Sequence, residues 1–203
     1  MRSVALVLLF AAFAPAATRD VTVLVDFEKP HSEVSIAALR QELKELLEPA
    51  GVSVEVKLRS ELPTNPEFSE LVVFHMKGSC SMDMVYVPIT EPPSELGPLA
   101  MAYSSDGQIL HFGEVECDRV RQCVQRVTGL GGAQRHQAAY GAALAIVIAH
   151  EIYHMICGAK EHTKSGLTKE SLSAHELLDG SLSIPLAVRE LMRRDFPGES
   201  AKF

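Results

Sequence analysis

The stretch from Ala149 to His154 holds two imidazoles and a carboxylate whose spacing suits a metal ion. His150 and His154 are four residues apart, which is just over one helical turn, so both rings leave the same face of a helix. A divalent metal such as zinc needs nitrogen ligands that are fixed in this way. Glu151 lies one step around the helix and can reach a water beside the metal without binding the metal itself. This is the HExxH pattern, and it predicts a metal site.

The residues around this motif also favour a metal. Residues 138–157 read as a helix that is packed on most sides, and only His150, Glu151 and His154 are charged or imidazole groups within it. Burying these three groups is costly without partners, and a metal satisfies all of them together. The alternative is a pair of core histidines that bond to carbonyl groups beside an exposed glutamate.

A third ligand is expected shortly after the helix. Gly158 is placed to end the helix in a left-handed conformation, and the residues after it bring His162 back from a short loop. Glu161 is the nearest rival, because a carboxylate oxygen also binds zinc. The sequence therefore predicts His150, His154 and His162 as metal ligands, and it leaves Glu161 open as an alternative to His162.

The run HEIYHMICGAKEH, residues 150–162, resembles the zincin metallopeptidases. Among them it resembles the metzincins, whose extended motif has a helix-ending glycine and a third histidine. His162 follows the second histidine by eight residues, against about six in the metzincin pattern, and Gly158 comes one position late. The turn at residues 165–168 resembles one in secreted bacterial zincin-like proteins, with Thr168 where a methionine would stand.

The resemblance implies a zinc-dependent peptidase that acts on a peptide or protein. One catalytic zinc would be held by the three histidines, and the fourth position would be left to a water whose pKa falls to about 7. Glu151 would act as the general base that takes this water's proton. Tyr153 and His175 are the nearest candidates for a group that donates a hydrogen bond to the oxyanion.

Three alternatives stay open at this point. In a gluzincin arrangement the third ligand would be a later glutamate, for which Glu176 is well placed. A deformylase-like amidase would need a cysteine ligand, for which Cys117 and Cys123 are the nearby choices. The chain could also be an exported zinc-binding or interaction protein without turnover, but Glu151 favours an enzyme because a structural zinc site needs no base.

The N-terminus predicts export. Arg2 precedes an apolar run at residues 4–14 and then the small residues 14–17, which is the pattern of a secretory signal peptide. The run is too short to span a bilayer, and no cysteine follows it to accept a lipid. We therefore expect a signal peptide at 1–17 and a single metallopeptidase domain at 18–203, secreted or periplasmic, without a membrane anchor.

The charge of the chain argues against two classes of partner. The formal net charge is −7, and it becomes −8 when the signal peptide is removed, because that segment contains the single charged residue Arg2. The chain has no run of lysine or arginine. Nucleic acid and anionic lipid are therefore not expected as partners.

The cysteines predict disulfide bonding in an exported chain. Four cysteines permit two disulfides with three connectivities. Cys117 and Cys123 are six residues apart and would point apart on a helix, so a bridge from Cys80 to one of them is expected. The fourth cysteine is Cys157.

The hydrophobic pattern predicts a domain that mixes helices and strands. Residues 21–27 and 52–58 read as strands on either side of a helix at 32–50, which makes a right-handed βαβ unit with parallel strands. A nearly all-apolar strand at 71–76 suits the centre of a sheet. The later predicted elements are a loop at 77–98, strands at 99–104 and 108–115, helices at 118–128 and 134–157, a helical turn at 171–178, and a last helix that is capped by Ser183 with Pro185 and ends near Arg194.

The elements and the resemblance together give the fold class α+β. They imply a zincin-like twisted mixed sheet packed on the long motif helix, with a short helical C-terminal part. Ser105, Asp106 and Gly107 form a hairpin signal between two of the strands. In zincins an edge strand lies antiparallel to bound substrate, and this hairpin is the natural candidate for that strand. Otherwise it is an ordinary edge hairpin.

Overall fold

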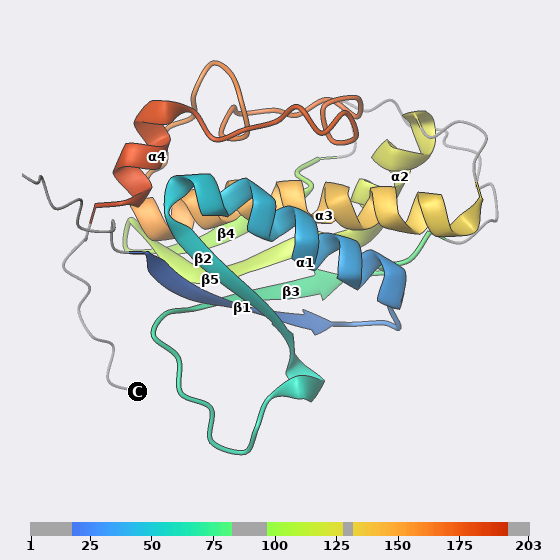
Figure 1. Cartoon of the computed structure of the whole chain (residues 1–203), viewed down its shortest axis with the longest axis horizontal. Helices are drawn as coiled ribbons and strands as arrows, with labels where there is room; N and C mark the ends of the chain where they lie inside the picture. Colours follow the sequence, from blue (N-terminus) through green and yellow to red (C-terminus); the bar gives the residue numbers. More distant parts are fainter. Residues whose placement is uncertain (1–17, 83–96, 128–131, 195–203) are drawn as a thin grey trace, which may run out of the picture.

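The computed structural model of the chain describes residues 18–82, 97–127 and 132–194. The predicted signal peptide at 1–17 and residues 83–96 of the predicted loop lie outside the described residues. The described part has two layers, with a five-stranded sheet on one side and the helices α1 and α3 on the other (Figure 1). The mixture of helices and strands that the sequence predicts is confirmed.

The sheet is mixed and mostly parallel. Its strands lie in the order β2-β1-β3-β5-β4. Neighbouring strands are parallel except β4, which is antiparallel to β5 and forms one edge of the sheet. The strands are β1 (Arg19–Phe27), β2 (Val52–Leu58), β3 (Leu71–Lys77), β4 (Ala100–Ser105) and β5 (Gln108–Glu116), each close to its predicted range.

The first elements form the parallel βαβ unit that the sequence predicts. Helix α1 (Glu33–Leu47) begins after Ser32, whose hydroxyl accepts a hydrogen bond from the Ser35 backbone N–H at 3.4 Å, as an N-cap residue does. A short 3-10 turn, η1 (Glu48–Ala50), leads into β2, and a second, η2 (Arg59–Glu61), follows β2. The apolar stripe of α1 consists of the buried residues Ile36, Leu39, Leu43, Leu46 and Leu47.

Strand β3 lies at the centre of the sheet, as its apolar sequence predicts. Val72, Phe74 and Met76 are fully buried, whereas the residues between them are partly exposed. Successive side chains of a strand point to opposite faces. The alternating burial therefore shows that the two faces of the sheet differ, with one face packed in the core and the other more open.

Strands β4 and β5 form the predicted hairpin. Its turn residues Asp106 and Gly107 both have positive φ, at 50° and 82°, which is the conformation of a two-residue type I′ turn. Across the hairpin, Ala102 lies opposite Gly113. The hairpin therefore supplies the antiparallel edge of the sheet, with β4 outermost.

The long helix α3 (Ala133–Cys157) is the centre of the core. Its length and composition alone would let it cross a membrane, but 94% of its most apolar stretch is buried inside the protein. A Cβ added to Gly141 would lie 2.1 Å from the Ser35 carbonyl oxygen on α1. A Cβ added to Gly113 on β5 would lie 2.7 Å from Met155 Cε on α3. These two glycines let α3 pack closely on α1 and on the sheet, which fixes the position of the motif.

The C-terminal part differs from its prediction in one place. The predicted helical turn at 171–178 is present, because the Leu177 and Asp179 backbone N–H groups donate to the Ser173 and His175 carbonyls at 3.1 and 3.0 Å. The last helix, α4 (Leu186–Met192), begins after Pro185 and is not capped by Ser183. The Ser183 carbonyl instead accepts a hydrogen bond from the Leu167 backbone N–H at 3.0 Å, so Ser183 holds the loop that follows α3.

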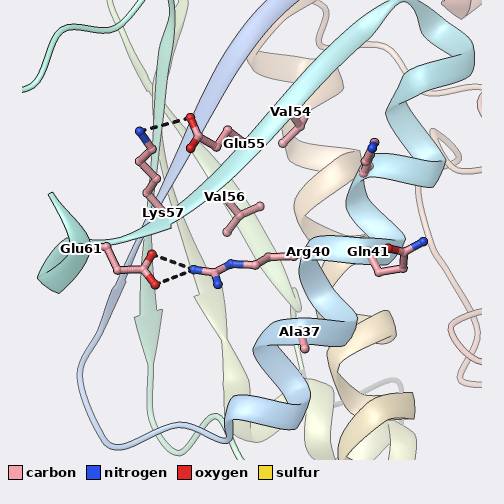
Figure 2. Close-up of a pocket in the computed structure, with 9 residues that line it drawn as sticks. Ala37, Arg40, Gln41, Val54, Glu55, Val56, Lys57 and Glu61 are labelled. Atoms are coloured by element: carbon pink, nitrogen blue, oxygen red, sulfur yellow. Dashed lines mark hydrogen bonds and ion pairs between the residues drawn. The ribbon is translucent and has the colours of Figure 1, made fainter.

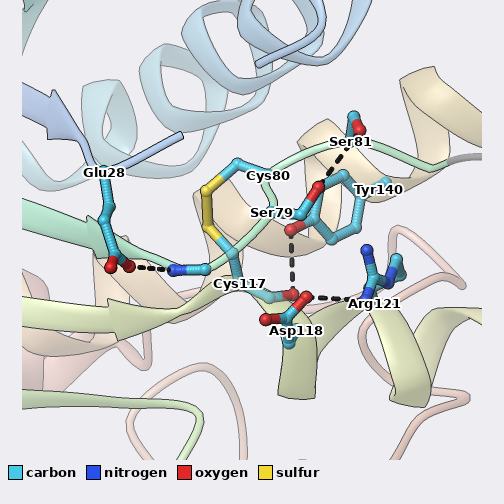
Figure 3. The surroundings of a disulfide bond; sticks show 9 residues. Glu28, Ser79, Cys80, Ser81, Cys117, Asp118, Arg121 and Tyr140 are labelled. Carbon is cyan, nitrogen blue, oxygen red and sulfur yellow. Dashed lines mark hydrogen bonds and ion pairs between the residues drawn. A yellow bond between two sulfur atoms is a disulfide. The ribbon is translucent and has the colours of Figure 1, made fainter. Parts of the chain in front are cut away.

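A disulfide joins Cys80, just after β3, to Cys117, the first residue of α2 (Cys117–Val127) (Figure 3). The Tyr140 hydroxyl of α3 donates a hydrogen bond to the Cys117 carbonyl at 2.9 Å, so the end of β3, α2 and α3 meet at this point. The expected bridge from Cys80 is confirmed. Cys123 and Cys157 are both buried as thiols, so the second of the two disulfides that four cysteines permit is not formed.

The double variant C80A/C117A should lose up to about 4 kcal/mol of unfolding free energy. The bridged cysteines are separated by 37 residues, and closing a loop of that length restricts the unfolded chain. Urea denaturation followed by circular dichroism measures the loss. A reductant should destabilise the wild type by a similar amount and leave the double variant unchanged. Equal stability of the wild type with and without reductant would contradict the bridge.

Candidate metal centre

The last turns of α3 place two histidine rings against each other. His150 is half-buried and His154 is buried. Their Nε2 atoms are 3.1 Å apart, as the spacing of four residues predicts. The two rings meet edge to face, with centroids 4.8 Å apart.

His162 joins this pair from the loop after α3. Gly158 ends the helix with a φ of 58°, in the left-handed conformation that the sequence predicts. The chain then returns, and His162 Nε2 lies 3.1 Å from His154 Nε2. One ligand atom from each of the three histidines lies within 4.8 Å of the others, and this group could hold a metal ion. Within the described residues, no other group of three or more histidine, cysteine or acidic side chains converges in this way.

Two hydrogen bonds hold the returning loop on the helix. The His154 Nδ1 atom lies 2.6 Å from the Ala159 carbonyl oxygen. The Tyr153 hydroxyl donates to the Glu161 carbonyl at 2.9 Å. These bonds fix the backbone on the N-terminal side of His162. They explain how a third histidine eight residues after the second still reaches the other two.

Backbone carbonyls also set the protonation of the rings. The His150 Nδ1 atom lies 2.9 Å from the Leu167 carbonyl oxygen, and His154 Nδ1 faces Ala159 in the same way. A carbonyl oxygen only accepts, so Nδ1 of each ring carries the proton and Nε2 of each neutral ring is left with a bare lone pair. Two lone pairs that face each other across 3.1 Å repel unless a cation lies between them.

The distances fit a zinc ion. Zinc binds imidazole nitrogen at about 2.0–2.1 Å in a tetrahedral arrangement, which puts two nitrogen ligands about 3.3 Å apart. The Nε2 atoms of His154 and its two partners are separated by 3.1 Å. Neutral imidazole with its other nitrogen bonded to a carbonyl is also the usual form of a histidine ligand. The donor set of this site therefore suits zinc.

The electrostatic surroundings keep two of the rings neutral. Burial lowers the pKa of His150 to about 4, although the hydrogen bond to the Leu167 carbonyl opposes the shift. Burial also lowers the pKa of His154. Both rings are therefore neutral at pH 7, the protonation state in which a histidine binds a metal.

Glu151 lies beside the histidines and outside their group. Its side chain is buried, and this burial raises its pKa to about 7. A hydrogen bond from the Ala102 backbone on β4 favours the charged form and opposes this rise. Glu151 thus lies between the metal centre and the edge strand of the sheet. A carboxyl group with a pKa near 7 exchanges a proton readily at neutral pH.

The turn at residues 165–168 contributes through its backbone. Leu167 and Thr168 are fully buried, and the Leu167 carbonyl contacts His150. The Thr168 side chain, which stands where the resemblance placed a methionine, forms a hydrogen bond with Thr163 between their hydroxyl oxygens at 2.8 Å. The turn therefore orients the His150 ring, and Thr168 closes the loop on itself.

The alternative ligands have other partners or lie outside the histidine group. The Glu176 carboxylate accepts hydrogen bonds from Lys169 and Ser173, with the Lys169 bonds at 2.5 and 2.7 Å. These bonds lower the pKa of Glu176 to about 2. The Glu161 side chain is exposed and is not part of the converging group. Cys117 is bound in the disulfide, and Cys123 is outside the converging group as well.

The two candidates for an oxyanion donor differ in their surroundings. Tyr153 donates its hydroxyl hydrogen to the Glu161 carbonyl, so it holds the loop. His175 is exposed and lies in a turn. The contacts of Tyr153 and His175 therefore do not indicate that either residue donates a hydrogen bond to an oxyanion.

Sequence reasoning missed three groups that support the site, the carbonyls of Ala159 and Leu167 and the backbone of Ala102. All three are main-chain groups. Every residue carries them, so the residue type gives no signal of their use.

A surface hollow of about 600 Å³ lies between α1 and β2 (Figure 2). None of its lining residues belongs to the histidine group. Its charged side chains pair with each other, Arg40 with Glu61 at 2.7 Å and Lys57 with Glu55 at 3.1 Å. The hollow therefore adds no group to the candidate metal centre.

Comparison with known proteins gives one similar structure. No model of a protein family matches the chain, and no curated protein sequence matches it. The chain is similar to the crystal structure of an archaemetzincin from Methanopyrus kandleri, with a TM-score of 0.48 and 15% sequence identity. The similarity covers 90% of this chain and 97% of that one. At this level of similarity the chain is not assigned to a family.

The three candidates for the third ligand can be separated by zinc affinity. His162→Ala should weaken zinc binding by more than about 100-fold, because a site with three ligands is reduced to two. Glu161→Gln and Glu176→Gln should bind zinc as the wild type does, since both carboxylates lie outside the histidine group. Competition against a chromogenic chelator measures the affinities. Weak binding in either glutamine variant, with normal binding in His162→Ala, would move the third ligand to that glutamate.

Proposed function

We propose that this protein is a zinc-dependent peptidase in which His150, His154 and His162 hold one zinc ion. The observation that carries the proposal is the convergence of three imidazoles within 4.8 Å beside a buried carboxylate, Glu151. The Glu151 carboxylate also lies next to the open edge strand β4, where the Ala102 backbone bonds to it. A sheet edge binds an extended peptide through its free backbone groups.

The residues of the chain have distinct roles in this proposal. Zinc supplies Lewis acidity and lowers the pKa of water when it is bound. Glu151 takes a proton from the attacking water at a carboxylate oxygen and then gives it to the leaving amine. The carbonyls of Leu167 and Ala159 keep the two helical ligands in the tautomer that presents Nε2.

Glu151 favours an enzyme over an inert binding protein. Structural zinc sites are usually closed by a fourth cysteine or histidine and need no nearby base. Here the converging group has three histidines, and a buried carboxyl group with a pKa of about 7 lies beside them. Burying such a group costs free energy, which is difficult to explain if it does no chemistry.

We also propose that the protein is exported, with residues 1–17 removed as a signal peptide. The support is the sequence pattern of Arg2, an apolar run and small residues, together with a disulfide, Cys80–Cys117. Disulfides persist in oxidising compartments and are rare in the cytosol.

Export predicts that protein recovered from outside the cytoplasm begins at about residue 18. Intact mass and N-terminal sequencing of the exported protein check this. A variant with Leu8→Arg in the apolar run should stay in the cytoplasm at full length. Full-length wild-type protein found in the cytoplasm alone would contradict the proposal.

Glu151→Gln should reduce turnover by about 10²- to 10⁴-fold and leave zinc content unchanged. The amide keeps the shape of the side chain but takes no proton from water at neutral pH. Hydrolysis of an unbiased peptide library, followed by mass spectrometry, measures turnover, and elemental analysis measures zinc at about one ion per chain.

Glu161→Gln is the matched control, because Glu161 is an exposed glutamate near the site. It should keep both turnover and zinc. A wild-type protein that holds zinc and cleaves no peptide would instead make the chain a binding protein.

A further inference from the structure

Apolar side chains are exposed together on the outer face of the hairpin β4–β5. Of the five large hydrophobic residues that are exposed within the described chain, four lie on this hairpin. They are Met101, Tyr103, Leu110 and Phe112, at 36–43% exposure, and we call them the outer strip. The fifth, Leu186, lies on α4. Such a concentration on one hairpin indicates a surface with a partner.

The outer strip lies on the sheet face that points away from α3. A Cβ on Gly113 would meet Met155 of α3, so Gly113 and its partner Ala102 face the helix. Because side chains alternate along a strand, Met101 and Tyr103 point to the opposite face. There the Tyr103 ring packs on Phe112 with centroids 5.4 Å apart.

Tyr103 is held in place by its hydroxyl as well. This hydroxyl donates a hydrogen bond to the Glu114 carboxylate at 2.9 Å, and Lys77 bonds the other oxygen of the same carboxylate at 2.9 Å. The ring therefore has a fixed orientation next to the edge of the sheet, which lowers the entropy cost of contact with a partner.

Strand β4, which carries Met101 and Tyr103, presents its free backbone groups toward Glu151. The Leu99 carbonyl accepts a hydrogen bond from the Glu116 backbone at 2.9 Å, so the backbone groups of Leu99 and, by alternation, of Met101 point toward β5. The backbone groups of Ala100 and Ala102 then point to the free edge, and the register of the hairpin shifts only after Ala102. The bond from Ala102 to Glu151 places this free edge beside the proposed base.

We propose that Met101 and Tyr103 select the substrate, by contact with two side chains of an extended peptide that adds to the free edge of β4. This inference rests on the proposed peptidase function. Residues that lie opposite each other on neighbouring strands have side chains on the same face, about 4.5–5.5 Å apart. The peptide residues opposite Met101 and Tyr103 are therefore two positions apart and lie on the outer face. The residue between them lies opposite Ala102 and faces Glu151.

The preferred substrate is thus an extended peptide with the pattern apolar–x–apolar, cleaved next to x. Aromatic and β-branched residues suit the two apolar positions, because they gain most from cross-strand contact with Tyr103 and Met101. The residue x is limited only by the space near the metal centre.

A peptide is favoured over a second copy of the chain by the size of the outer strip. Four side chains of this exposure offer roughly 300 Å², whereas a stable dimer buries about 800 Å² on each partner. A short segment that already pairs with the β4 edge needs no larger apolar surface.

The test compares two peptides that differ only at the two flanking positions, one with valine or tyrosine and one with serine. Wild-type protein with zinc should cleave the apolar peptide with a kcat/KM about tenfold higher. The double variant M101S/Y103S should lose this preference, mainly through KM. Leu186→Ser is the matched control, because Leu186 is also an exposed large hydrophobic residue but lies on α4, outside the outer strip. It should keep the preference.

Binding provides a second measurement that is independent of turnover. Zinc-loaded Glu151→Gln should bind the fluorescently labelled apolar peptide about tenfold more tightly than the serine peptide, measured by fluorescence anisotropy. Adding M101S/Y103S to that variant should remove the difference. If circular dichroism shows that the double variant does not fold, wild-type protein and Glu151→Gln decide the proposal. Both should prefer the apolar peptide over the serine peptide.

The outcomes separate this inference from the proposed function. Equal cleavage of the two peptides, or an equal loss of preference in Leu186→Ser, would overturn the role of Met101 and Tyr103 and leave the peptidase intact. Selective binding of the apolar peptide without any cleavage would support the role of these residues and overturn the peptidase.

Discussion

The site depends on one constraint, that polar groups on a buried helix are satisfied by the protein itself. Helix α3 lies in the core with 94% of its most apolar stretch buried, yet its last turns carry Glu151 and His154 at 8% and 7% exposure. Bulk water solvates groups at this depth only weakly, so each needs a partner. Main-chain carbonyls accept from Nδ1 of His150 and His154, which leaves their Nε2 atoms facing each other. A cation between these atoms is the arrangement that satisfies them.

The close packing around α3 gives this arrangement its precision. Where Gly141 meets α1 and where Gly113 meets Met155, a single added carbon would lie within 2.1 and 2.7 Å of its neighbour. Packed interiors transmit such displacements, so α3 has little freedom to slide or tilt relative to the sheet. The disulfide and the Tyr140 hydroxyl hold the other end of the helix through Cys117. The distance between Glu151 and the β4 edge is therefore set by contacts along the whole helix.

Much of the fold and of the candidate site could be predicted from the sequence, because these parts follow from the periodicity of helices and strands. The four-residue spacing places His150 and His154 on one face, alternation identifies the strands, and Asp106 with Gly107 marks the hairpin. Helix geometry left Cys117 and Cys123 as the possible partners of Cys80. The folded chain brings Cys117 to Cys80, and these two form the disulfide. The cap at Ser183 was predicted wrongly, because the Ser183 carbonyl holds Leu167, a contact that local sequence does not encode. The choice among His162, Glu161 and Glu176 also depended on the loop path, since all three residue types bind zinc.

The departures from the metzincin pattern are linked to the contacts that surround His162. A longer return from helix to third histidine leaves the loop with more freedom, and a ligand on a free loop costs entropy to immobilise. Here the Glu161 carbonyl is held by Tyr153 and the Ala159 carbonyl by His154, so the added length is restrained on both sides of Lys160. The turn lacks a methionine at Thr168, but its backbone still reaches His150 through Leu167. Main-chain groups thus both restrain the loop before His162 and orient the His150 ring, so neither contact depends on the type of side chain at Ala159, Glu161 or Leu167.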